Sequence, residues 1–129
     1  MTNFKDQNSN TGVGRPRFDL EQRAELFARR VRALVRVLPR TVSNREDIKQ
    51  LVRASGSVAA NYIEANDALG KKDFMMKIKL ARREAKESRL FLSLVDTADN
   101  DSVEDERAAL VQEARELVNI LSKIAQNVT

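Results

Sequence analysis

Apolar residues recur along this chain at alternating steps of three and four in four separate segments, which is the spacing of one face of an α-helix. The first row consists of Leu20, Ala24, Phe27, Val31, Leu34 and Leu38. The other rows include Leu51, Ser55, Val58, Tyr62 and Ala65, then Phe74, Ile78, Ala81, Ala85, Ser88, Leu92 and Val95, then Val103, Leu110, Ala114, Leu117, Leu121, Ile124 and Val128. The pattern predicts amphipathic helices near residues 19–38, 44–69, 71–96 and 102–127.

Residues at the breaks between these rows favour the same boundaries. Asp19 and Ser102 are placed to cap the first and fourth helices, and Pro39 cannot continue the first helix from inside it. Ser43 and Glu46 have the spacing of a capping box. Because short loops make consecutive helices antiparallel neighbours, we expect an all-α fold, an antiparallel up-down-up-down four-helix bundle over residues 19–129.

Composition narrows the function classes. The chain has 129 residues, no cysteine and no histidine, so it lacks a disulfide framework, a thiolate metal site and the commonest general base. No apolar run approaches the ~20 residues that cross a bilayer, and residues 1–18 are polar enough to predict a flexible N-terminal tail. The sequence predicts a cytoplasmic, non-enzymatic protein with no membrane association, cofactor or metal.

Small and polar residues interrupt the second helix. Gly56 in a helix interior costs about 1 kcal/mol relative to Ala, which predicts the close approach of a neighbouring helix. Asn61 and Glu64 lie on one face, and Arg82 or Arg83 of the next helix is the expected partner of Glu64. Two interpretations arise, a structural polar cluster of Asn61, Glu64 and Arg83 or a binding or catalytic pair. The lack of His, Cys or a second acid favours the structural one.

Charge is unevenly distributed along the chain. The overall net charge is +4, but residues 71–96 carry eight basic and four acidic side chains, whereas residues 97–129 carry three basic and seven acidic ones. Basic residues also form rows at helical spacing. These are Arg29, Arg32 and Arg36 on the first helix, and Lys72, Lys79, Arg82, Lys86 and Arg89 on the third. Several cations along one line attract a polyanion, so these eight residues are candidates for binding RNA or DNA.

Three segments of the central hairpin resemble a known family. They read Ser57-Val58-Ala59-Ala60-Asn61-Tyr62-Ile63-Glu64-Ala65, Lys72-Asp73-Phe74, and Ala81-Arg82-Arg83-Glu84-Ala85-Lys86-Glu87-Ser88. The chain resembles the four-helix-bundle family first noticed as open reading frames in intervening sequences of bacterial 23S ribosomal RNA, which includes accessory proteins of diversity-generating retroelements. Phe91 stands where many relatives have Trp, and Gly70 where many have Ser.

The resemblance implies a ring-like homo-oligomer, with a pentamer favoured, that binds nucleic acid and a reverse transcriptase. The third helix has a second apolar row, which consists of Met76, Leu80, Phe91 and Leu94. This row makes the apolar surface of the helix wider than a two-helix seam needs, which also favours an oligomer. We therefore predict an accessory or scaffold protein that binds nucleic acid through a basic face of an oligomeric bundle. The alternative is a structural protein–protein interaction module that binds no nucleic acid.

Overall fold

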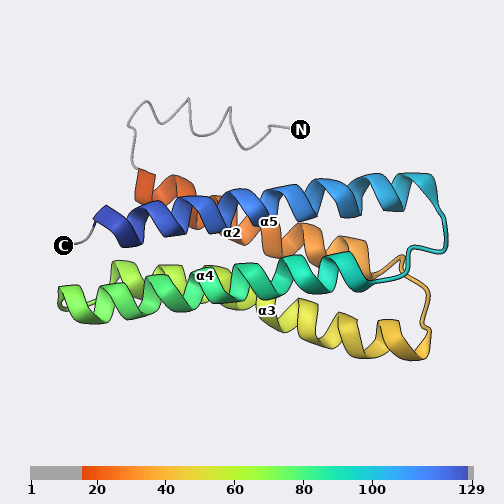
Figure 1. The fold of residues 1–129 in the computed structure, drawn as a ribbon, viewed down its shortest axis with the longest axis horizontal. Helices are drawn as coiled ribbons and strands as arrows, with labels where there is room; N and C mark the ends of the chain where they lie inside the picture. The colour runs from red at the N-terminus through yellow and green to blue at the C-terminus, as the bar shows by residue number, and fades with distance from the viewer. Residues whose placement is uncertain (1–15, 128–129) are drawn as a thin grey trace.

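Residues 16–127, the part of the chain described by the computed structural model, form four α-helices and contain no β-strand. The helices are α2 (Pro16–Val35), α3 (Val42–Asn66), α4 (Lys71–Leu94) and α5 (Asp101–Asn127). Each helix runs antiparallel to the one before it (Figure 1). The predicted all-α, up-down-up-down arrangement is confirmed. The predicted tail lies outside the described residues at positions 1–15, whereas residues 16–18 belong to α2.

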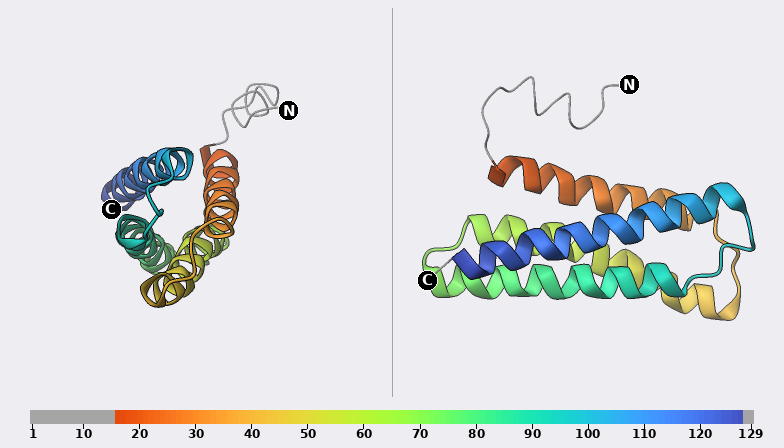
Figure 2. Two further views of the ribbon diagram at one scale, coloured as in Figure 1. Left: turned by 90° about the vertical axis from the view of Figure 1, so that its right-hand side faces the viewer. Right: turned by 45° about the horizontal axis from the view of Figure 1, so that its top comes forward.

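The four helices surround a common centre when the bundle is viewed end-on (Figure 2). Packing contacts join α2 to α3, α3 to α4, α4 to α5 and α5 to α2, and they are most extensive between α3 and α4. Helices α2 and α4 therefore occupy diagonal positions. This placement decides which of the basic rows can share a surface.

The core is built from the predicted apolar rows. Side chains with almost no exposed surface come from all four helices and include Phe27, Leu51, Ile78, Leu92, Leu110, Leu117 and Leu121. The polar members of two rows, Ser55 and Ser88, are buried as well, and each donates its hydroxyl to a backbone carbonyl of its own helix. Small side chains at these positions let α3 and α4 pack closely.

Two predicted boundaries of the first helix are wrong. The helix begins at Pro16, before Asp19, because the fixed φ of proline and its missing N–H suit the first helical position. It ends at Val35, before Leu38, and Nη1 of Arg40 donates to the carbonyls of Val35 and Leu38 at 2.8 and 2.9 Å. This arginine satisfies carbonyls at the end of the helix that have no intrahelical partner.

The caps of the second and fourth helices also differ from the prediction. Thr41, and not Ser43, caps α3, since its Oγ1 accepts the N–H of Asn44 at 3.1 Å. At the start of α5, Oδ1 of Asn100, two residues before the predicted cap Ser102, accepts the N–H of Val103 at 3.1 Å. Short polar side chains that precede these helices compete for the same role, so the capping residue shifts by two positions in both helices.

The α2–α3 and α4–α5 loops meet at one end of the bundle (Figure 1). One side chain, that of Asn44, joins them by hydrogen bonds. Asn44 is fully buried; its Nδ2 donates to the carbonyls of Pro39 and Asp96, and its Oδ1 accepts the N–H of Asp96, all at 2.9 Å. The α2–α3 loop is thereby joined to the α4–α5 loop.

Arg107 stabilises the α4–α5 loop by hydrogen bonds to both of its sides. Its Nη1 donates to the carbonyls of Leu92 and Val95 at 3.1 and 2.8 Å, and its Nη2 binds Glu104 at 2.6 Å. The hydrogen bond from Arg107, and then that from the Thr97 hydroxyl, lowers the pKa of Glu104. Both donors favour the ionised carboxylate.

Candidate nucleic-acid interface

The basic row of α4 is the largest set of unpaired cations on the bundle. Lys72, Lys79, Lys86 and Arg89 are exposed and Arg82 is partly buried. Across residues 16–127, no carboxylate lies within ion-pair distance of these five side chains. Their charges are therefore available to a ligand.

Two of the three acids of α4, Glu84 and Glu87, are bound by an arginine of α3 and not by this row; the third, Asp73, is exposed and has no ion pair among the described residues. Nη1 of Arg53 lies 3.4 Å from Oε1 of Glu84, and Nη2 lies 3.1 Å from Oε1 of Glu87. Glu84 is buried, with only 7% of its side chain exposed, and its Oε1 has no hydrogen-bond partner in the described part of the chain. This buried carboxylate was not predicted, although Glu84 lies three residues after Ala81 and four before Ser88, which is the spacing of the buried row.

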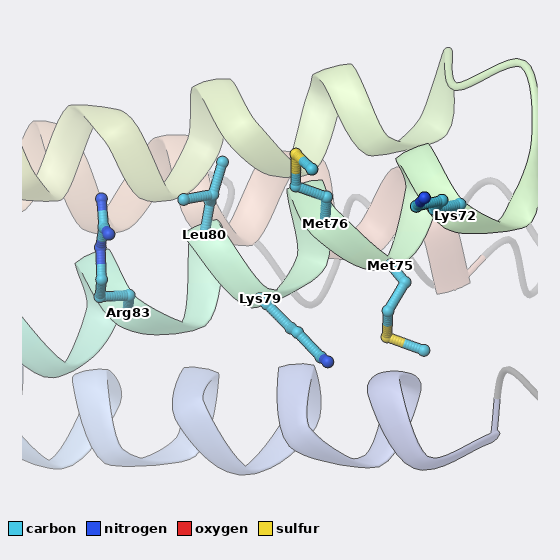
Figure 3. A pocket seen from close by; sticks show the side chains of 6 residues that line it. All are labelled: Lys72, Met75, Met76, Lys79, Leu80 and Arg83. Atoms are coloured by element: carbon cyan, nitrogen blue, oxygen red, sulfur yellow. The ribbon is translucent and has the colours of Figure 1, made fainter.

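A surface pocket of about 490 Å³ lies at the N-terminal half of the α4 row. Its lining is formed by α4 alone, from Lys72, Met75, Met76, Lys79, Leu80 and Arg83. Figure 3 shows Lys79 and Met75 extending towards α5, whereas Leu80 and Met76 lie on the side of α3. The pocket thus combines an apolar surface with cations at its edges.

The cations of the first predicted basic row, Arg29, Arg32 and Arg36, differ from those of α4 in their pairing and burial. Arg29 is paired with Glu25 of its own helix at 2.8 Å, and Arg36 is exposed without an ion pair among the described residues. Arg32 is partly buried and donates through Nη1 to the carbonyl of Ala28 at 3.1 Å. The three members of this row therefore differ in availability.

Two other arginines of α2, Arg23 and Arg30, form ion pairs with α5. Arg23 contacts Glu113 and Glu116, each at 2.7 Å, and Arg30 contacts Glu106 at 3.0 Å. The hydrogen bond to Glu113 makes the largest contribution to a raised pKa of Arg23. These ion pairs link the two neighbouring helices that pack least extensively against each other.

The predicted basic face does not form as one surface. The exposed faces of α2 and α4 point away from each other because the two helices lie diagonally across the bundle (Figure 2). The row of Arg29, Arg32 and Arg36 is therefore separate from the row of Lys72, Lys79, Arg82, Lys86 and Arg89. A short ligand bound to one row does not reach the other on the same chain.

The predicted cluster of Asn61, Glu64 and Arg83 is not assembled. Nδ2 of Asn61 donates to the carbonyl of Ser57 at 2.9 Å, which is a contact within its own helix. Glu64 is exposed and pairs with Lys77 at 3.1 Å, in place of the expected Arg82 or Arg83. Lys77 lies nearer the hairpin loop, at the level where α4 passes Glu64. Among the described residues, no hydrogen bond or ion pair joins Asn61, Glu64 and Arg83 to one another.

Gly56 meets a side chain, not the closely approaching helix that was predicted. A Cβ at this position would lie 3.2 Å from Nη2 of Arg32. The described residues contain no group of His, Asp, Glu or Cys side chains that could hold a metal ion. None of the helices in the described range is long and apolar enough to span a membrane.

The fold and its surface define a class, a small antiparallel four-helix protein with a row of unpaired cations on one helix. The chain belongs to the family of 23S rRNA-intervening sequence proteins, whose sequence model matches residues 17–123. The crystal structure of a protein of unknown function from the S23 ribosomal protein family of Bacteroides thetaiotaomicron has the same fold, with a TM-score of 0.69 and 24% identity. The match covers 83% of this chain and 98% of that one. No curated protein matches.

Proposed function

We propose that this chain is a non-enzymatic nucleic-acid-binding protein that holds RNA through the basic row of α4. The observation that carries the proposal is the unpaired state of Lys72, Lys79, Arg82, Lys86 and Arg89 beside acids that are bound elsewhere. The family description, which refers to intervening sequences of 23S rRNA, supports RNA as the nucleic acid.

Electrostatics sets the expected mode of binding. Each phosphate that meets a Lys or Arg releases condensed counterions, so affinity should fall steeply with salt. The chain has only six aromatic residues, one Tyr and five Phe, which limits base stacking and predicts little sequence preference. Arg29 should contribute little, because Glu25 already neutralises it.

Fluorescence anisotropy with a labelled RNA hairpin, single-stranded DNA and duplex DNA at two salt concentrations tests the proposal. Lys79→Glu/Lys86→Glu should lower the affinity for RNA at least about tenfold and flatten its salt dependence. Arg29→Glu/Lys123→Glu makes the same change in net charge at a paired site and on α5, and should have a much smaller effect. Equal losses in both variants would show that only net charge matters. A wild type that binds none of the three probes at low salt would overturn the proposal.

We also propose that the chain forms a homo-oligomer, with the ring-like pentamer implied by the family resemblance as the favoured state. The supporting observation is apolar surface on α4, where Met76, Leu90 and Leu94 are 55%, 51% and 55% exposed. Light scattering on the purified chain measures the state directly. A monomer at tens of micromolar would contradict the proposal and favour the second candidate function, in which the same apolar side chains dock another protein.

A further inference from the structure

A partly buried arginine occupies the seam between α2 and α3. Nη1 of Arg32 donates to the carbonyl of Ala28 at 3.1 Å, and Nη2 lies 3.5 Å from the carbonyl of Val52. A guanidinium has five N–H donors, so these contacts leave most of its donors without a partner in the described part of the chain. The two carbonyls hold the group in place without neutralising its charge.

Gly56 provides the room for this guanidinium. A Cβ on Gly56 would lie 3.2 Å from Nη2 of Arg32, which is closer than an ordinary van der Waals contact. Glycine in a helix interior lowers helix stability relative to alanine. At this position, the group that occupies the space is the positively charged guanidinium of Arg32. The absence of a side chain at Gly56 therefore leaves space on α3 for the guanidinium of Arg32, whose position is fixed by its hydrogen bonds.

Two more cations lie along the same seam. Arg36 is four residues beyond Arg32, just past the end of α2, and Lys49 is one turn before Val52 on α3. Because α2 and α3 are antiparallel, Arg36 and Lys49 both lie between the Arg32–Val52 contact and the α2–α3 loop. Both are exposed.

The acids that flank this seam do not neutralise it. Glu25, towards the start of α2, is bound to Arg29 at 2.8 Å. Glu46 makes one contact of 3.5 Å with Lys49, whereas two hydrogen bonds of 3.0 and 2.8 Å join Arg29 to Glu25, so Lys49 is the more readily released of the two cations. No carboxylate within residues 16–127 is in ion-pair distance of Arg32 or Arg36.

We propose that the α2–α3 seam is a second binding site for the phosphate backbone of nucleic acid, with Arg32 as its fixed contact. A held guanidinium presents parallel N–H donors to two oxygens of one phosphate. Arg36 and Lys49 then attract the adjoining phosphates. A carboxylate also fits one guanidinium, but three cations along a line match the repeating charge of a phosphodiester chain. This proposal rests on the proposed function. The site lies on the side of α3 away from the α4 row, so one chain contacts nucleic acid on two separate surfaces.

The test combines four single variants with anisotropy of a labelled 20-nucleotide single-stranded RNA at low salt. Arg32→Gln should weaken binding about five- to tenfold, whereas Arg29→Gln, with the same charge change at a paired arginine, should leave it within about twofold. Gly56→Ala leaves the net charge unchanged but displaces the guanidinium, and should weaken binding about threefold. Gly70→Ala is the matched control, since a Cβ there meets nothing within 4 Å. Circular dichroism confirms that each variant is folded.

A second measurement is independent of the α4 row. In the folded chain, the Nε–Hε resonance of Arg32, assigned by its loss in Arg32→Gln, should shift on addition of inorganic phosphate and not of chloride at equal ionic strength. If the wild type binds RNA but Arg32→Gln and Gly56→Ala behave like their controls, the second site is wrong and the α4 proposal stands. If the wild type binds no RNA, the α4 proposal fails and the phosphate titration alone decides; an unshifted resonance then overturns the site. Competition by poly-glutamate as strong as that by RNA would overturn its assignment to phosphate.

Discussion

The arginines of α2 and the cations of α4 have similar spacing in the sequence, but the folded chain uses them differently. Arg23 and Arg30 of α2 bind acids of α5, and Arg29 binds an acid of its own helix. Lys79 and Lys86 of α4 have no carboxylate partner in the described range. The same pattern of positive charge therefore stabilises the bundle on one helix and is available to a ligand on the other.

The neighbouring helix accounts for the difference. Helix α5 places Glu106, Glu113 and Glu116 within reach of α2. In contrast, Arg53 of α3 binds Glu84 and Glu87 of α4. A basic row is thus available only where no acids line the adjoining seam. Counting charges along a single helix does not reveal this.

The largest effect on stability should come from removing a paired arginine. Arg23→Ala leaves Glu113, whose side chain is only 17% exposed, without its cation and should lower the free energy of unfolding by about 1–2 kcal/mol. Lys79→Ala, at an unpaired site, should change it by less than about 0.5 kcal/mol. Urea unfolding followed by circular dichroism measures both. Equal losses of unfolding free energy in Arg23→Ala and Lys79→Ala would mean that the cations of α2 and α4 contribute equally to stability.

Acid should produce a smaller effect, at the α4–α5 loop. The pKa of Glu104 is lowered in the fold by Arg107 and Thr97, so its contribution is present above the ordinary pKa of a glutamate, about 4.3, and is lost as the pH falls through the folded value. Thermal unfolding between pH 7 and pH 3 should therefore show a shallower acid dependence in Glu104→Gln than in the wild type. Identical slopes would exclude a role for this carboxylate in acid stability.

The smallest change in stability is expected at single α4 cations. Lys86→Gln should leave the free energy of unfolding within about 0.5 kcal/mol of wild type, because the side chain is exposed and unpaired. The same variant should reduce the slope of log affinity against log salt by about one, as expected for one lost phosphate contact. An unchanged slope would remove Lys86 from the RNA surface.

The amino-acid pattern predicted the helices well and the side-chain pairing poorly. Apolar rows such as the one containing Phe27 and Val31 predicted buried faces because a 3.6-residue period specifies one side of a helix. The partner of Glu64 was wrong, since the choice between Lys77 and Arg83 depends on the rotation of α4 about its axis. Gly56 predicted the close approach of a neighbouring helix, whereas its neighbour is the end of the Arg32 side chain, which no local signal in the sequence identifies.

Asn44 has a consequence for the order of folding. Its side chain joins the α2–α3 loop to the α4–α5 loop, so its two hydrogen bonds to Asp96 exist only after both halves of the chain have docked. Interactions completed after the transition state alter the unfolding rate and leave the folding rate nearly unchanged. Asn44→Ala should therefore shorten the lifetime of the native state while the chain reaches that state as fast as before, which stopped-flow refolding and unfolding can measure. The side-chain amide of Asn44 would then determine the kinetic stability of the folded bundle.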